Sequence, residues 1–190
     1  LSDISPENYG DHYRFIKTFD GYTLKITDVN NLNIVGLGKK PVKIITKPRY
    51  GYVIVFENCT NIIIDNIEAG HGPEKGICIG GVFKFINSKN ITINNSIMFG
   101  SGTEGITAEN VNNFKCNNST IRGCTYRIMS LNNCNDLEFN NCEFIDNKEF
   151  DLINISNSSV INFKSCYIEN NITYGGKYGN FLINVDKSSS

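Results

Sequence analysis

The stretch Asn113-Phe-Lys-Cys-Asn-Asn-Ser119 recurs further along the chain, in the same frame, as Asp136-Leu-Glu-Phe-Asn-Asn-Cys142. Related copies begin at Asn61, Asn90 and Val160, and a shorter one begins at Asn31. The first apolar residues of the copies, whose numbers increase by 30, 29, 23, 23 and 24, are Leu32, Ile62, Ile91, Phe114, Leu137 and Ile161. An internal period of this kind is the signature of a repeat architecture.

Two further short apolar stretches flank the copies. One precedes the copy, as in Val53–Phe56, Val82–Phe85, Gly105–Ala108, Ile128–Leu131, Leu152–Ile155 and Phe181–Val185. The other follows it, as in Ser96–Met98, Thr120–Ile121, Glu143–Phe144 and Tyr167–Ile168. The alternation of apolar and polar residues, broken by Asn, Gly or Ser, is typical of short β-strands joined by sharp turns. Each repeat is therefore predicted to contain three strands.

Three strands in so short a repeat are too few for the four-stranded blade of a β-propeller, whose period is about 40–45 residues. No helical pattern lies between the strands, and no short hairpin turn joins them. Such strands wind as a coil, and coils that stack about 4.8 Å apart form a parallel β-helix. The sequence predicts an all-β solenoid of six to seven coils over residues 24–186, with an N-terminal cap over 1–23 and a tail over 187–190.

The composition agrees with this fold, because the 190 residues include 29 Asn and 27 Ile. Positions buried in a parallel stack favour β-branched side chains such as Ile. Sharp corners favour Asn, which tolerates the left-handed backbone region. The corner pairs 94–95, 117–118 and 140–141 are all Asn and recur at the same interval as the repeat. Their side chains are predicted to form amide ladders from coil to coil.

Charge and hydropathy exclude two classes of partner. The chain has 18 basic and 19 acidic residues and a net charge of −1, so it lacks the positive charge that binds nucleic-acid phosphates. No apolar run approaches the roughly 18 residues of a membrane-spanning helix. The start at Leu1-Ser-Asp3 has no charged segment followed by an apolar one, so no signal peptide is predicted there.

The Cys content predicts buried thiols. The chain has seven Cys and two His residues, and an odd number of Cys cannot pair completely within one chain. No Cys-x-x-Cys occurs, which disfavours a zinc site. We expect the Cys residues to act as small buried hydrophobic residues, with one disulfide as the alternative.

Three short motifs lie in the early loops, and they read Gly70-His71, Cys78-Ile-Gly-Gly-Val82 and Gly100-Ser-Gly-Thr103. Together with the repeats, they resemble the bacterial right-handed parallel β-helix proteins of the pectate-lyase-like superfamily. The resemblance covers roughly residues 24–170 and is greatest to a largely uncharacterised subgroup of secreted or surface proteins. Ser101 stands where that subgroup has Cys. The resemblance implies a right-handed coil and an extracellular or cell-surface location, and it carries over no catalytic residue.

Glu104, Arg127 and Asp151 follow one another at the interval of the repeat, so the coils are predicted to stack them in one column. The favoured interpretation is a solvent-facing ladder of ion pairs, each worth about 0–1 kcal/mol. A ligand-binding column is the second interpretation. The third is a Ca²⁺ site beside an Arg base, as pectate-lyase chemistry requires. No other cofactor or metal is expected.

His71 lies in the longest mid-chain insertion, close in sequence to Glu74 and Lys75. In register, its column continues through Gly100 and Gly123, whose missing side chains predict open space beside the imidazole. The sequence therefore predicts a small ligand groove at this point. The alternative is that the imidazole bonds a backbone carbonyl in a Gly-rich turn.

Aromatic residues in the loops are the remaining candidates. Tyr174 and Tyr178 lie in a Gly-rich loop, and Tyr126 precedes Arg127; aromatic rings of this kind can stack on a sugar. The loops that carry the candidate residues are predicted to emerge on one side of the solenoid, over 70–81, 99–105, 123–127, 146–151 and 170–180.

Three functions are compatible with these observations. The first is a non-catalytic secreted or cell-surface module that binds glycan or another surface component through its loops. The second is a structural spacer, adhesin or toxin segment of a longer protein, with end-to-end self-association or further domains after Ser190. The third is a polysaccharide lyase or glycoside hydrolase with an atypical site. Fold alone cannot separate them, because function belongs to sites and not to folds.

Overall fold

The computed structural model describes residues 22–46, 51–72, 80–100, 102–173 and 181–186. Within these ranges the regular secondary structure consists of β-strands. The described residues contain no helix long and apolar enough to cross a membrane. The predicted all-β class is confirmed.

The strands form three long parallel sheets, which we call sheets A, B and C. Sheet A contains, in spatial order, β1 (Tyr22–Thr27), β4 (Tyr52–Glu57), β7 (Phe83–Ile86), β10 (Glu104–Glu109), β13 (Arg127–Asn132), β17 (Ile153–Ser156) and β21 (Ile183–Val185). Sheet B contains β2 (Asn30–Val35), β5 (Thr60–Asp65), β8 (Lys89–Asn94), β11 (Asn112–Asn117), β14 (Asn135–Asn140) and β18 (Ser159–Lys164).

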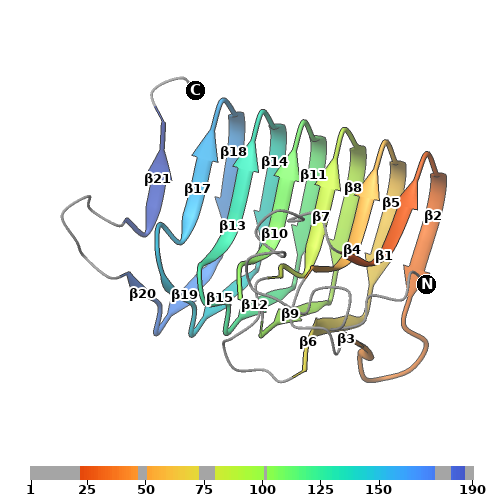
Figure 1. Cartoon of the computed structure of the whole chain (residues 1–190), viewed down its shortest axis with the longest axis horizontal. Helices are drawn as coiled ribbons and strands as arrows, with labels where there is room; N and C mark the ends of the chain where they lie inside the picture. Colours follow the sequence, from red (N-terminus) through yellow and green to blue (C-terminus); the bar gives the residue numbers. More distant parts are fainter. Residues whose placement is uncertain (1–21, 47–50, 73–79, 101, 174–180, 187–190) are drawn as a thin grey trace, which may run out of the picture.

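Sheet C contains β3 (Val42–Thr46), β6 (Ile67–His71), β9 (Ile97–Phe99), β12 (Thr120–Arg122), β15 (Glu143–Ile145) and β19 (Tyr167–Glu169). A small fourth sheet pairs β16 (Lys148–Glu149) with β20 (Ile172–Thr173). The chain visits sheets A, B and C in turn, so each round is one coil. Six coils are complete, and β21 starts a seventh, as Figure 1 shows along the long axis of the molecule. The predicted parallel β-helix is confirmed.

The register between coils agrees with the sequence period. Leu137 pairs with Ile161, and Phe114 pairs with Leu137. Asn117 pairs with Asn140 in the same ladder. Equivalent residues of successive repeats are therefore direct neighbours, which is the condition on which every predicted column depends.

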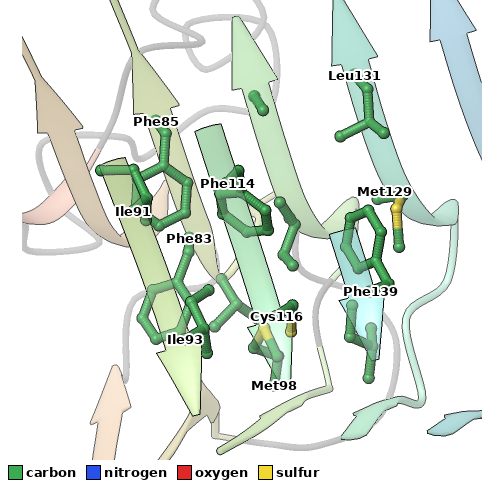
Figure 2. Close-up of a cluster of buried hydrophobic side chains, with 14 of the residues drawn as sticks. Phe83, Phe85, Ile91, Ile93, Met98, Phe114, Cys116, Met129, Leu131 and Phe139 are labelled. Carbon is green, nitrogen blue, oxygen red and sulfur yellow. The ribbon is translucent and has the colours of Figure 1, made fainter. Parts of the chain in front are cut away.

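A column of phenylalanine rings runs through the core. Phe56 stacks on Phe85 with ring centroids 5.1 Å apart, and the edge of the next ring, Phe114, meets Phe85 at 5.6 Å. Phe139 follows at 5.8 Å from Phe114, and Phe163 stacks on Phe139 at 4.9 Å. Figure 2 shows the middle of this column among Ile and Met side chains. Inward positions of neighbouring coils thus build one continuous core.

The sharp corners are built by residues in the left-handed conformation, as the Asn content predicts. Asn58, Asn87, Asn110 and Asn133 form one corner column with φ between 49° and 55°. The Asn110 amide donates to Asn87 at 2.8 Å, and the Asn133 amide donates to Asn110 at 2.6 Å. Each amide therefore satisfies its neighbour along the axis while its backbone makes the turn.

The predicted ladders at the corner pairs are also present. The Asn117 amide donates to Asn94 at 2.9 Å, and the Asn140 amide donates to Asn117 at 2.9 Å. In the neighbouring column, Asn141 donates to Asn118 at 3.3 Å. Asn95 instead donates at 2.9 Å to Asp65, which lies in the column of Asn94. The ladder prediction is confirmed for Asn94, Asn117 and Asn140, and in the neighbouring column for Asn118 and Asn141.

Six Cys residues lie in the described ranges, and none of the six forms a disulfide. Five are buried, and Cys166 is half-buried. The Cys142 thiol donates to the Cys116 carbonyl oxygen at 3.2 Å. Burial raises the pKa of the Cys134 thiol, which makes it a poor nucleophile. For these six residues the buried-thiol interpretation is confirmed, while Cys78 lies outside the described residues.

The predicted domain ends lie largely outside the described part of the chain. Of the cap over residues 1–23, Tyr22 and Thr23 are described, and both belong to β1. The tail over residues 187–190 is not described.

Val160 is a β-branched residue in a corner column of left-handed residues whose earlier members are Asn or Asp. It has φ 54° and is 55% exposed, while the equivalent residues of earlier coils are Asn113 (φ 55°) and Asp136 (φ 59°). A side chain branched at Cβ is strained there. We expect Val160→Asn to stabilise the fold by about 1 kcal/mol, seen as a higher urea midpoint with an unchanged slope.

The reverse substitution is the control. Asn113→Val places the same strain in an inner coil and removes the Asn113 amide's 2.9 Å bond to Asn90, so the urea midpoint should fall. A midpoint that falls with Val160→Asn would contradict the assignment of strain to this corner.

Candidate ligand-binding site

The predicted column of charged residues lies where the loops enter sheet A. Strand β10 begins at Glu104 and β13 at Arg127, and these two residues pair in the parallel register. Asp151 lies two places before Ile153, as Arg127 lies two places before Met129, and Ile153 pairs with Met129. The stacking expected from the spacing is therefore present.

The ion pair in this column is largely buried, so the expectation of a solvent-facing ladder is wrong. The Arg127 Nε atom lies 3.8 Å from Glu104 Oε1, and the two side chains are 26% and 14% exposed. Burial raises the pKa of the Glu104 carboxyl, while the Arg127 charge opposes the rise. Desolvation is the larger effect because the two side chains are removed from most of the solvent.

The pH dependence of stability tests this balance. A carboxyl whose pKa is raised by folding stabilises the protein while protonated, and this contribution is lost as the pH rises from about 4.5 through the raised pKa. We expect the unfolding free energy of the wild type to fall relative to that of Glu104→Gln between about pH 4 and pH 7. Urea titrations at both pH values measure the difference. A difference that grows in favour of the wild type would show instead that the ion pair dominates.

Asp151 does not complete the ladder as expected, because its carboxylate binds the seventh coil. Its Oδ1 accepts the backbone N–H of Phe181 at 2.8 Å, and its Oδ2 accepts the Asn184 amide at 3.1 Å. A carboxylate can satisfy several N–H donors of a chain that changes direction. Asp151 therefore anchors the entry to β21.

A Tyr side chain bridges three coils beside the ion pair. The Tyr52 hydroxyl lies 3.0 Å from the Thr107 hydroxyl, which in turn donates to Glu104 Oε2 at 3.5 Å. The ring lies across Gly81, where a Cβ atom would approach it to 2.3 Å. Lys84 lies above the ring at 5.6 Å from its centroid. A side chain at position 81 would thus displace Tyr52 from this network.

The His71 imidazole bonds a backbone carbonyl group, which is the structural role given above as the alternative to a ligand groove. Its side chain is 1% exposed, and Nε2 lies 3.0 Å from the Gly81 carbonyl oxygen. A Cβ atom on Gly80 would lie 2.7 Å from the imidazole, so the ring fills the space above this glycine. Among the described residues, the imidazole is enclosed and the open space predicted beside it is not present. The imidazole thus holds Gly80 and Gly81 against β6 through this hydrogen bond and through close packing.

An aromatic pair lies on the loop side next to the ion pair. The rings of Tyr126 and Phe150 meet edge to face at 5.2 Å, and Phe150 is 46% exposed. The Phe150 N–H donates to the Tyr126 carbonyl oxygen at 3.2 Å, so the two residues occupy equivalent places in successive coils. The backbone N–H groups of Tyr126 and Arg127 both donate to the Thr103 carbonyl oxygen. This arrangement fixes the aromatic pair directly beside the start of β13.

Sequence reasoning included Tyr126 and missed Phe150. The signal that could have found it is the interval between the two rings, which equals the interval between Arg127 and Asp151. The structure thus brings Glu104, Tyr126, Arg127 and Asp151 to neighbouring places.

Four predicted site residues, Glu74, Lys75, Tyr174 and Tyr178, lie outside the described residues. Among the residues that are described, no three His, Cys, Asp or Glu side chains gather as metal ligands. The two carboxylates considered for Ca²⁺ have other partners, since Glu104 faces Arg127 and Asp151 binds the seventh coil.

No protein-family model matches the chain, and no curated protein matches it. Among solved structures, it is similar to a proposed glycosyl hydrolase from Parabacteroides merdae, at 10% identity and a TM-score of 0.49, over 82% of this chain and 84% of that one. It also matches QnrB1, a plasmid-mediated fluoroquinolone resistance protein, at 15% identity and a TM-score of 0.18, over 88% and 92%. The assignment of this chain to the parallel β-helices therefore rests on its own strand pairing.

Proposed function

We propose that this chain is a non-catalytic, extracellular or cell-surface module that binds glycan through the loop side of its β-helix. The observation that carries the proposal is the aromatic pair of the half-buried Tyr126 and the exposed Phe150. Aromatic rings offer a flat apolar face to the C–H groups of a sugar ring. The neighbouring Arg127 can donate hydrogen bonds to hydroxyl groups at the edge of the same sugar.

The arrangement of carboxylates supports binding over hydrolysis. Glycoside hydrolysis generally uses two carboxyl groups on opposite sides of the scissile bond, separated by about 5–10 Å. Here Glu104 is paired with Arg127, and Asp151 accepts two hydrogen bonds from the next coil. Both carboxylates therefore already have protein partners, and neither is free to act as a catalytic acid or base beside the aromatic pair.

A glycan array followed by calorimetric titration of the best hit tests the proposal. We expect Phe150→Ala and Tyr126→Ala each to weaken binding about tenfold or more, which corresponds to about 1.4 kcal/mol. Tyr167→Ala is the matched control, because Tyr167 is an exposed aromatic residue on sheet C that is not part of the Tyr126–Phe150 pair. Equal affinity in all three variants, or an array without signal, would overturn the proposal.

The open end of the last coil favours a second candidate function, that of a spacer within a longer stack. Strands β18 and β19 have no described strand on their outer side. Inward-facing residues of the last coils, such as Ile168, Ile183 and Val185, are 41–53% exposed. Unpaired edges and apolar ends of solenoids need to be covered.

Sedimentation over a range of protein concentrations tests the second candidate. We expect the wild type to associate end to end, and a double variant with Ile168→Lys and Ile183→Lys to stay monomeric. A wild type that is monomeric at all concentrations would exclude self-association through this end.

A further inference from the structure

A trough lined mostly by uncharged polar residues lies on the outer face of sheet B, on strands β2, β5 and β8. It has a volume of about 340 Å³ and is lined by Asn31, Asn33, Asn61, Ile63, Asn90 and Thr92. These six residues form two parallel columns of three, because Asn33 pairs with Ile63 and Ile63 pairs with Thr92 in the register of the sheet. The trough therefore runs along the axis of the β-helix.

The first column is an amide ladder at a left-handed corner. The Asn61 amide donates to Asn31 Oδ1 at 2.9 Å, and the Asn90 amide donates to Asn61 Oδ1 at 2.8 Å. Each Asn side chain has two N–H donors and two lone pairs on its oxygen. The ladder bond from Asn90 uses one of its two N–H groups, so the second N–H and the second lone pairs remain available to a ligand.

The second column combines hydrogen-bonding ends with an apolar centre. The side chains of Asn33 and Thr92 have no hydrogen-bond partner among the described residues, and Ile63 between them is 39% exposed. A sugar has the complementary pattern, with hydroxyl groups around the ring and C–H groups on its face. Hydroxyl groups can pair with the two polar side chains while the C–H face covers Ile63 and removes it from water.

The charge of the trough defines the ligand further, because none of its six residues is charged. In the second column, charged residues follow in the later coils, where Lys115 and Glu138 lie 4.0 Å apart. Binding an ionic ligand in a neutral trough would desolvate its charge without a partner. Three coils also span about 10 Å, at about 4.8 Å per step, which suits an elongated ligand.

We propose that this trough is a second binding site, which holds an uncharged saccharide chain lying along the β-helix axis. The site is independent of the loop side, since it lies on sheet B and shares no residue with the aromatic pair. Its recognition relies on amides and an aliphatic centre in place of aromatic rings.

Nuclear magnetic resonance with neutral hexasaccharides tests the site. The probes are cellohexaose, xylohexaose, maltohexaose and laminarihexaose, and the readout is the side-chain amide signals of the labelled protein. We expect at least one probe to shift the signals of Asn31, Asn33 and Asn90. The double variant Asn33→Ala, Thr92→Ala should bind that probe about thirtyfold more weakly, which corresponds to about 2 kcal/mol for the two lost hydrogen bonds.

Matched variants separate this proposal from the proposed function. Asn162→Ala, in the same column on β18, should leave both the trough signals and the affinity unchanged. Phe150→Ala should alter binding at the loop side and leave the trough signals unchanged. If Phe150→Ala removes all binding, the trough proposal is overturned and the loop-side function stands. If the double variant Asn33→Ala, Thr92→Ala removes all binding, the loop-side function is overturned and the trough proposal stands.

Two other outcomes overturn the trough proposal. One is that no neutral probe shifts the Asn amide signals at any soluble concentration. The other is that hexagalacturonate, an anionic chain of similar length, binds the trough as tightly as the best neutral probe. Because the substituted side chains are accessible to solvent, we expect each variant to keep the fold. The urea midpoint of each variant checks this.

Discussion

Replacement of Phe114 by Ala is expected to lower the unfolding free energy by about 3–5 kcal/mol. The ring is fully buried in the fourth of the six complete coils and contacts Phe85 and Phe139 of the two neighbouring coils. Its removal leaves a cavity that separates the two halves of the aromatic column. Because small proteins are stable by only about 5–15 kcal/mol, this single change should remove a large part of the total. Urea unfolding followed by circular dichroism measures it.

Two controls assign the loss to the core. Phe150→Ala is the same chemical change at a ring that is half exposed, and it should cost about 1 kcal/mol or less. Phe114→Leu keeps most of the volume and should cost less than Phe114→Ala. If Phe114→Ala and Phe150→Ala cost the same, the continuous aromatic column does not stabilise the solenoid as described.

Replacement of Gly80 by Ala is expected to have the second largest effect, a loss of about 2–3 kcal/mol or more. The added Cβ atom would lie 1.9 Å from the Gly51 carbonyl oxygen and 2.7 Å from the His71 ring. The first contact is with backbone of the preceding coil, which cannot rotate away as a flexible side chain can. The turn must shift, and the hydrogen bond between His71 and Gly81 should weaken with it.

Gly72→Ala is the matched control for this prediction. A Cβ atom there meets Ile45 Cγ2 at 3.2 Å, and this side chain is half exposed and can move. We expect this variant to differ from the wild type by less than about 1 kcal/mol. The His71 imidazole signals should change in Gly80→Ala and stay constant in Gly72→Ala. Equal stability of the two variants would contradict the close packing of the Gly80-Gly81 turn.

The fold was predictable because the spacing of the sequence repeats equals the number of residues in one coil. A β-helix pairs each residue with the equivalent one of the next coil, so a spacing such as that from Asn117 to Asn140 becomes a contact. The same reasoning placed Glu104 next to Arg127. It also identified the corners, because left-handed backbone favours Asn wherever the turn is sharp.

The candidate site was predictable in its sequence positions and not in its environment. The period placed Glu104, Arg127 and Asp151 in one column, yet it could not show that the pair is mostly buried or that Asp151 binds the next coil. Burial depends on which loops and coils cover a position, and this depends on long-range packing. For the same reason the sequence suggested a groove at His71, where the ring in fact fills the space.

The sequence by itself determined the coil, the register and the corner chemistry of this protein, since all three repeat at a fixed spacing along the chain. The tertiary structure alone decided which polar groups are accessible. It enclosed His71, left Phe150 exposed beside the half-buried Tyr126 on the loop side, and left a neutral trough between amides on sheet B. The physical reason is that hydrogen-bonded register is a local, periodic property, whereas solvent access is set by every segment that packs over a position.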